Sequence, residues 1–399
     1  MQPSPLQELI FNTHDIILLA TIYQSILFAL LIFLARHKRQ RSDYYLIGFL
    51  LAQAAIPLHL LINYGDGFRL IALEVSPNLF KLFEIAYWLE APLLLWYVRS
   101  LVYREYKWSR VDLLFLAPVA IYLLYVATDF YLLDHDIKHD MLRDNVSARG
   151  SFTQHLLFGF GREILRMAFG IMCLIDIRHC RQQIRNRYSN VDDIDLGWLN
   201  FLVGAFLLVR VWAVLVAVAV IASADLNINI NFGTMGLIGN YTTFILVSAL
   251  IFFSLMSSSL FEGVDSPKEV VKIEAERDKS DINLSLASKV ENYMADHKPF
   301  LANILTLEQL ATQLKIPPRT LSHIINHHFK YNFFEFVNRY RVEEAKRILA
   351  DPEQTNKTMI EVMADCGFNS KATFNTFFKK LAGMTPSQYR ASKSDLPKS

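Results

Sequence analysis

The sequence predicts an all-α protein with an N-terminal seven-helix transmembrane bundle and a C-terminal all-helical domain. Seven apolar segments of about twenty residues fill residues 1–260. Hydrophobic residues make up 53% of the 399 residues and the mean hydropathy is +0.24, more than a soluble core normally requires. Residues 284–399 carry two patterns of helix, break and helix. We therefore expect two domains, joined by residues 261–283.

Each apolar segment is long enough to cross a bilayer, which requires roughly 20 helical residues because backbone groups must bond internally there. The expected spans lie near residues 15–35, 44–63, 79–98, 111–130, 156–177, 197–221 and 234–257. No Lys or Arg precedes Arg36, so the basic start of a cleaved signal peptide is missing and the first segment should remain as an anchor. Pro57, Pro92 and Pro118 predict kinks.

Basic loop residues predict the orientation, because cytoplasmic loops are rich in Lys and Arg. The loops after the first, third and fifth spans hold twelve: Arg36, Lys38, Arg39, Arg41, Arg99, Arg104, Lys107, Arg110, Arg178, Arg181, Arg185 and Arg187. The alternate loops hold four: Arg69, Lys138, Arg143 and Arg149. This asymmetry predicts a multi-pass protein of a bacterial inner membrane, with its N-terminus outside and its C-terminal domain in the cytoplasm.

Ionisable side chains interrupt three of the expected spans. They are Lys81, Glu84 and Glu90 in the third, Arg162, Glu163 and Arg166 in the fifth, and Arg210 in the sixth. Such residues are costly in a membrane and mark either ion pairs that fix helix packing or a ligand site. Glu90 and Arg210 fall at mid-depth and are candidates to pair with each other. Because four cations face three carboxylates, a small anionic or amphiphilic ligand is a candidate partner.

Other classes of function have less support. We find no internal repeat and no matching pair of broken helices, which disfavours a transporter or channel without excluding it. No nucleophile–base pair, phosphate loop or metal-ligand spacing stands out, and Cys173, Cys180 and Cys366 show no paired spacing. We therefore expect neither an enzyme nor a bound metal or cofactor.

The joining residues 261–283 are charged, with four basic and seven acidic side chains. They predict a solvated tether or, alternatively, a helical stalk for dimerisation or signalling. By contrast, residues 284–399 hold 16 basic and 11 acidic side chains. This basic balance favours an anionic partner for the C-terminal domain.

The first helix-turn-helix pattern covers residues 306–328. Its opening, TLEQLATQL, places apolar residues on one face, and Lys315-Ile316-Pro317 breaks the helix. In the second helix Leu321, Ile324 and Ile325 should face the core. The residues expected to contact DNA are Arg319, Thr320, Ser322, His323 and Asn326. In a major groove Arg suits guanine and Asn suits adenine, although such a stripe is more often a solvated face.

The second pattern covers residues 358–381, with Gly367 at the turn and Phe374 and Phe378 as anchors of its second helix. Ser370 should cap that helix, whose free N–H groups can hold a phosphate. The outward residues expected to contact DNA are Ser370, Lys371, Asn375, Thr376, Lys379 and Lys380. Between the two patterns, residues 333–349 form a predicted amphipathic helix that supplies both cores.

Residues 284–390 resemble the DNA-binding domain of the AraC/XylS family of bacterial transcription regulators. The resemblance rests on NRYRVEEAKRIL and on GFNSKATFNTFFKKLAGMTPSQYR. It implies two helix-turn-helix units, with Arg319, Ser322 and His323 on the first recognition helix and Lys371, Asn375 and Thr376 on the second. Lys330 stands where the family commonly has Gly, and Met363 where it commonly has Ala.

The apolar N-terminal part, residues 1–260, looks like the membrane domain of a subgroup of these regulators. The sequence thus favours a one-component regulator that senses a signal in the membrane and binds double-stranded promoter DNA. A homodimer is compatible with this interpretation. The alternatives are a membrane transporter or channel with a regulatory tail, and a tethered DNA binder without sensing.

Overall fold

The computed structural model describes residues 13–35, 40–103, 106, 108–144, 152–191, 196–226, 232–256 and 284–394. The expected linker, residues 261–283, lies outside them. The chain divides into two compact units. The first comprises residues 1–177 and 197–266, and the second residues 178–196 and 267–399. Residues 178–196 thus group with the C-terminal part, which the sequence had not led us to expect.

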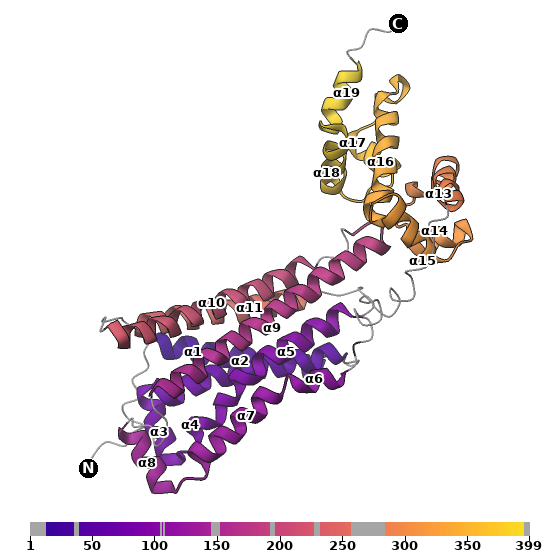
Figure 1. Ribbon diagram of the computed structural model, residues 1–399. Helices are drawn as coiled ribbons and strands as arrows, with labels where there is room; N and C mark the ends of the chain where they lie inside the picture. The colour runs from indigo at the N-terminus through magenta and orange to yellow at the C-terminus, as the bar shows by residue number, and fades with distance from the viewer. Residues whose placement is uncertain are drawn as a thin grey trace. The chain divides into compact units, whose positions relative to one another are not determined.

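The described residues of the first unit form helices joined by short connecting segments (Figure 1). Its helices are α1 (Thr13–Ala35), α2 (Arg41–Tyr64), α3 (Asp66–Val75), α4 (Leu79–Leu82), α5 (Ala86–Val102), α6 (Arg110–Leu114), α7 (Ala117–Val126), α8 (His135–Asp144), most of α9 (Phe152–Arg187), α10 (Gly197–Leu226) and α11 (Phe232–Met256). α2 packs against α1 and α5, while α11 packs against α1 and α10. Large apolar side chains such as Leu34, Leu124 and Ile245 remain exposed, as expected for helices that face lipid.

Five helical segments among the described residues are long and apolar enough to cross a membrane. They are Thr13–Leu34, Arg41–Tyr64, Arg110–Tyr131, Gly197–Val220 and Thr234–Phe252. The third expected span is divided among α4, a 3₁₀ turn at Phe83–Ile85 and α5. The fifth lies within the 36-residue helix α9, which carries Arg162, Glu163 and Arg166. The count of seven spans therefore stays a prediction.

Two of the three prolines with predicted kinks lie inside helices, Pro57 in α2 and Pro92 in α5. Pro118 instead lies in the first turn of α7, where its missing N–H group costs nothing. At this position the expected kink is replaced by the break between α6 and α7.

The second unit contains the two predicted helix-turn-helix units. Its helices are α13 (Leu284–His297), α14 (Leu307–Leu314), α15 (Pro318–His323), a π-helical turn at Ile324–His328, α16 (Phe333–Ala350), α17 (Met359–Asp365), α18 (Lys371–Ala382) and α19 (Pro386–Ser394). Side chains of Thr306, Asn332, Thr358 and Ser370 cap α14, α16, α17 and α18. These caps explain why each helix begins where the sequence pattern changes.

Helix α16 supplies side chains to two separate hydrophobic cores, as its amphipathic pattern predicted. Phe336 and Val337 lie in the core of the first helix-turn-helix unit, with Leu310 and Leu321 among its members. Val342 and Ala345 lie in the core of the second. One continuous helix therefore fixes the spacing of the two helix-turn-helix units.

Lys330, which stands where the related family commonly has Gly, has a φ of 62°. This left-handed conformation is the one that glycine adopts without cost, so the turn keeps its geometry despite the lysine. Met363 is partly buried and packs against the second core. Neither departure from the family pattern disrupts the fold.

Candidate DNA-binding surface and intramembrane charge cluster

The first recognition helix has the inward and outward faces that its sequence predicted. Leu321, Ile324 and Ile325 are at most 1% exposed, whereas Arg319 is exposed at the first turn. The side chains of Thr320, Ser322, His323 and Asn326 are partly exposed. Asn326 Nδ2 donates a hydrogen bond to Ser322 Oγ at 3.3 Å, and the His323 and His327 rings stack at 4.4 Å. The outward stripe is thus a set of donors and acceptors on a helix anchored from behind.

The second recognition helix, α18, is anchored by Phe374 and Phe378, which are buried. Ser370 caps it: the Thr373 N–H group donates to Ser370 Oγ at 3.4 Å. The expected contact residues lie away from the core: Lys371, Thr376, Lys379 and Lys380 are exposed, and Asn375 is partly exposed.

These residues differ in the charge available to a nucleic acid. Lys380 Nζ lies 3.3 Å from Glu335 Oε1, so its charge is partly neutralised. Lys371, beside the capped N-terminus of α18, suits a phosphate oxygen, as does the exposed Lys379 in the last turn of that helix. Arg319 has the bidentate donor geometry that suits a guanine edge. The surface has the chemistry of a DNA-binding face at both units.

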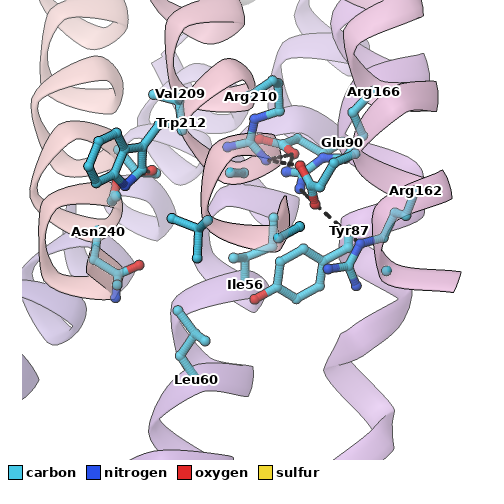
Figure 2. A pocket seen from close by; sticks show the side chains of 18 of the residues that line it. Ile56, Leu60, Tyr87, Glu90, Arg162, Arg166, Val209, Arg210, Trp212 and Asn240 are labelled. Carbon is cyan, nitrogen blue, oxygen red and sulfur yellow. Dashed lines mark hydrogen bonds and ion pairs between the residues drawn. The ribbon is translucent and has the colours of Figure 1, made fainter. Parts of the chain in front are cut away.

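A second concentration of charge lies inside the first unit. Five side chains form this charge cluster: Glu90 of α5, Arg162, Glu163 and Arg166 of α9, and Arg210 of α10. Figure 2 shows Glu90, Arg166 and Arg210 converging on one point. The candidate Glu90–Arg210 pair forms, with 3.7 Å between Glu90 Oε2 and Arg210 Nη1.

Arg166 and Arg210 each pair with both carboxylates of the charge cluster, and the contacts of Arg166 are the shorter ones. Arg166 contacts Glu90 directly, and its Nη1 lies 2.7 Å from Glu163 Oε1. Arg210 Nη1 lies 3.4 Å from Glu163 Oε2, and Arg162 lies over the Tyr87 ring. Three guanidinium groups therefore share two carboxylates.

Lys81 and Glu84 form a separate pair, with 2.9 Å between Nζ and Oε2. The seven ionisable residues singled out in the spans therefore divide into this pair and the charge cluster. The excess of one cation expected from the sequence stays with the charge cluster.

A cavity of about 380 Å³ adjoins the charge cluster in the first unit (Figure 2). Gln53, Tyr87, Trp212 and Asn240 line it beside the charged side chains, and Ile56, Leu60 and Val209 supply apolar walls. Sequence reasoning missed these neutral lining residues, because only charge marked a position inside an apolar helix as unusual. Gln53 Nε2 donates to Glu90 Oε1 at 2.6 Å, so a polar residue in the second span was an available signal.

Comparisons with known proteins concern the C-terminal part of the chain. Residues 310–392 match the model of a family described as a helix-turn-helix domain. A Bacillus subtilis protein named as an uncharacterized HTH-type transcriptional regulator YtdP is 34% identical over 92 residues, which are 23% of this chain and 12% of that protein. The Escherichia coli melibiose operon regulatory protein is 24% identical over 110 residues, which are 27% of this chain and 35% of the relative.

An uncharacterized HTH-type transcriptional regulator YijO of Escherichia coli is 35% identical over 89 residues, covering 22% of this chain and 30% of that protein. The chain thus spans at most about a third of the length of these relatives. No solved structure matches. The two helix-turn-helix units, their shared helix α16 and these likenesses show that the C-terminal part of the chain is an AraC-type helix-turn-helix domain.

Proposed function

We propose that this protein is a membrane-integrated one-component transcription regulator, which binds promoter DNA through its C-terminal domain in response to a signal detected by its first unit. No separate kinase is required, because sensor and DNA reader share one chain. The proposal rests on one observation: two recognition helices expose polar faces, and the hydrophobic cores behind both helices include side chains of α16.

The dimensions of α16 support binding to one face of a duplex. Its 18 residues span roughly 27 Å at 1.5 Å per residue. Successive major grooves on one face of DNA lie about 34 Å apart. The length of α16 is therefore comparable with the groove spacing, so recognition helices held on either half of α16 suit two adjacent major grooves.

The membrane placement rests on the apolar helices and on the basic loops. Five helices have the length and composition of spans, and the twelve basic loop residues favour the side of the membrane where DNA lies. A seven-span arrangement with the N-terminus outside brings the C-terminal domain into the cytoplasm. This topology and the helix-turn-helix fold point independently to the same compartment.

A fragment that begins at Asp281 tests the DNA-binding part of the proposal. We expect it to fold as a soluble helical domain and to retain promoter fragments from the neighbouring genes in a mobility-shift assay. Because phosphate contacts release counterions, the affinity should fall steeply as salt rises. A folded fragment that retains none of these promoters would contradict the proposal.

The cavity beside the charge cluster favours one alternative, a transporter whose tail only regulates it. Uptake or efflux of a solute by residues 1–260 alone would support that function. A regulator predicts no such flux, and its transcriptional response should require both units in one chain.

A further inference from the structure

The charge cluster carries a net positive charge among the described residues that line its cavity. Three arginines line this cavity, Arg162, Arg166 and Arg210, and its lining carboxylates are Glu90 and Glu163. Arg162 also interacts with Glu84, which is itself paired with Lys81. Arg166 is 2% exposed and Arg210 is 6% exposed. An uncompensated cation in such surroundings is unfavourable, so an anionic group placed beside it is stabilised.

The hydrogen-bonding capacity of the charge cluster is also incomplete. Among the described residues, Nε of Arg166 and Nε of Arg210 are buried and have no hydrogen-bond partner. Buried N–H donors normally have an acceptor, and each unsatisfied one carries a desolvation cost. The acceptor atoms Gln53 Oε1 and Glu90 Oε2 also lack a hydrogen-bond partner among the described residues. The surplus positive charge, together with the two guanidinium donors, is what favours an anionic acceptor.

A second cavity, of about 790 Å³, lies against the first. The two share Leu18, Leu60, Gly236 and Asn240 as lining residues. The second is lined by the start of α1, the end of α2 and the first turns of α11. The first cavity holds the charge cluster, whereas the walls of the second combine apolar Leu18, Leu60 and Leu237 with polar side chains that include His14 and Asp15. Each volume is in the range of ligand sites.

We propose that these two cavities together bind a single-tailed amphiphile with an anionic head group, with the head at Arg166 and Arg210 and the tail along the apolar side chains. This inference rests on the proposed function, since the amphiphile would be its signal. Ligand binding is measured without DNA, so a failure here and a failure of DNA binding remain distinguishable.

The test uses the full-length protein in phosphatidylcholine nanodiscs, with dodecanoate, dodecyl phosphate and dodecanol as probes. Thermal unfolding of the membrane unit reports binding. We expect at least one anionic probe to raise the unfolding midpoint at a concentration at least tenfold below that of dodecanol. The two anionic probes separate carboxylate from phosphate recognition. Equal effects of all three probes would overturn the proposal.

Variants that change the charge of the cluster sharpen the result. Arg210→Gln and Arg166→Gln each remove the surplus cation and should weaken binding at least tenfold. Glu163→Gln raises the surplus and should tighten binding. Lys81→Gln removes the same charge outside the cavity and should leave binding unchanged. Unaltered binding in both arginine variants means that the cluster only fixes helix packing, and overturns the proposal.

A second inference comes from the segment that follows α9 and belongs to the second unit. Residues 188–191, named here the docking segment, lie against the helix-turn-helix domain. Tyr188 forms an antiparallel bridge with Thr306. The Ser189 N–H group donates to the Leu305 carbonyl, and the Leu305 N–H group donates to Ser189 Oγ, each at 3.1 Å. Val191 packs against the second hydrophobic core.

The docking segment completes the hydrogen bonding of Arg341, a fully buried residue of α16. Arg341 Nη1 donates to the Ser189 carbonyl at 3.2 Å, and its Nη2 donates to Ser189 Oγ at 3.3 Å. Its Nε donates to the Phe300 carbonyl at 2.8 Å. Burial lowers the pKa of Arg341 to about 10, so it remains a cation at neutral pH. Among the described residues no carboxylate pairs with it, and carbonyl and hydroxyl oxygens satisfy it instead.

Arg341 lies where the two hydrophobic cores meet on α16, between Val337 of the first and Val342 of the second. The docking segment therefore contacts the joint between the two DNA-reading units. Helix α9 carries Arg162, Glu163 and Arg166 in the first unit and ends at Arg187, directly before the docking segment. Along the chain, the joint is thus connected to the charge cluster by one continuous helix.

We infer that the docking segment is a second attachment of the DNA-binding domain, besides residues 261–283, and that it delivers movement of α9 to the joint between the two reading units. Helix α16 sets the spacing of the two recognition helices, and movement at the joint changes their relative orientation and hence their fit to adjacent grooves. This inference stands on the contacts of Ser189 and does not depend on the ligand.

A disulfide tests the docking in the full-length protein. Partners in an antiparallel bridge have Cα atoms about 4.5–5.5 Å apart, within the range of a disulfide. We combine Tyr188→Cys with Thr306→Cys, replace the three native cysteines with Ala, and insert a protease site into residues 261–283. After mild oxidation of membranes and cleavage, we expect most of the C-terminal fragment to stay with the membrane until a reductant is added.

The matched control pairs Tyr188→Cys with Thr358→Cys, because Thr358 caps α17 as Thr306 caps α14. Equal retention in the two proteins would overturn the inference. Adding Ser189→Ala, which leaves the residues of the DNA-binding domain intact, should slow cross-linking several-fold, and Arg341→Met should do the same. Arg339→Met, a neighbouring change at a partly exposed arginine, should not. Cross-linking as fast with Ser189→Ala as without it also overturns the inference.

Discussion

The first helix-turn-helix unit turns at Lys315, with a φ of 55°, whereas the second turns at Gly367, with a φ of 81°. The Lys315 turn is made by local contacts, since its N–H group bonds to the Thr312 carbonyl. A Cβ atom at Gly367 would lie 2.6 Å from the carbonyl oxygen of Phe300, a residue of the hydrophobic core of the first helix-turn-helix unit. The second helix-turn-helix unit is therefore positioned by close contact with the first helix-turn-helix unit, and its turn is the less tolerant of substitution.

The largest expected effect comes from Gly367→Ala. The new methyl group meets backbone oxygen, and the positive φ adds strain, so we expect a loss of roughly 3 kcal/mol or more in unfolding free energy. Gly383→Ala is the matched control, because Gly383 has a φ of 77° but open space around it. That variant should lose only about 1 kcal/mol. Urea unfolding of the C-terminal fragment measures both, and equal losses would refute the contact-based account of the second turn.

The two helix-turn-helix units should also differ in which parts of DNA they contact. Arg319→Ala, in the first helix-turn-helix unit, should cost about 1–3 kcal/mol of binding free energy at one operator position and relax the base preference there. Lys379→Ala, in the second helix-turn-helix unit, should weaken binding to all DNA sequences similarly and reduce the salt dependence of the affinity. Binding titrations with single-base operator variants measure the contrast. If Arg319→Ala lowered specific and non-specific binding by the same factor, its base-reading role would be wrong.

A smaller effect is expected at the turn after the first recognition helix. Lys330→Gly relieves a left-handed lysine, but it also frees the unfolded chain, so the net gain should be about 1 kcal/mol or less. Lys346→Gly, within α16, should instead lose about 1 kcal/mol. Thermal unfolding of the two variants should shift in opposite directions. A lower midpoint for Lys330→Gly would show that the lysine contributes contacts of its own.

The smallest expected effect is a dependence of the unfolding free energy on pH. Hydrogen bonds from Arg347 and Lys298 lower the pKa of Glu344 below its ordinary value of 4.5. A carboxylate with a lowered folded-state pKa contributes stability above its unfolded pKa, and this contribution is lost as pH falls through the folded value. For partly exposed pairs the effect should stay below about 1 kcal/mol. Glu344→Gln should therefore reduce stability at pH 7 more than at pH 3, and an equal loss at both would contradict the ion-pair explanation.

Much of the second unit could be predicted because its signals are local. Thr306, Thr358 and Ser370 precede apolar periodicity and become caps, and the apolar stripe of α16 divides between two cores as expected. The role of Ser189 could not be predicted. Its partner Arg341 lies 152 positions away, and no charge or motif marks a serine after a helix as the acceptor of a buried guanidinium.

The charge cluster could be predicted in part. Charge within apolar helices marked Glu90 and Arg210, and their pairing is confirmed. The direct contact of Arg166 with Glu90 depends on how α9 is rotated against α5, which helical periodicity does not fix when charged and apolar residues are mixed. The same ambiguity hides the lining residues Gln53 and Tyr87.

Genome-wide mapping of DNA cross-linked to the intact, membrane-bound protein tests the central claim most directly. A membrane-integrated regulator predicts discrete sites upstream of genes. Arg319→Ala should abolish or shift these sites while the protein remains in the membrane. Uniform background recovery of DNA by the parent protein, with the variant indistinguishable from it, would contradict the account.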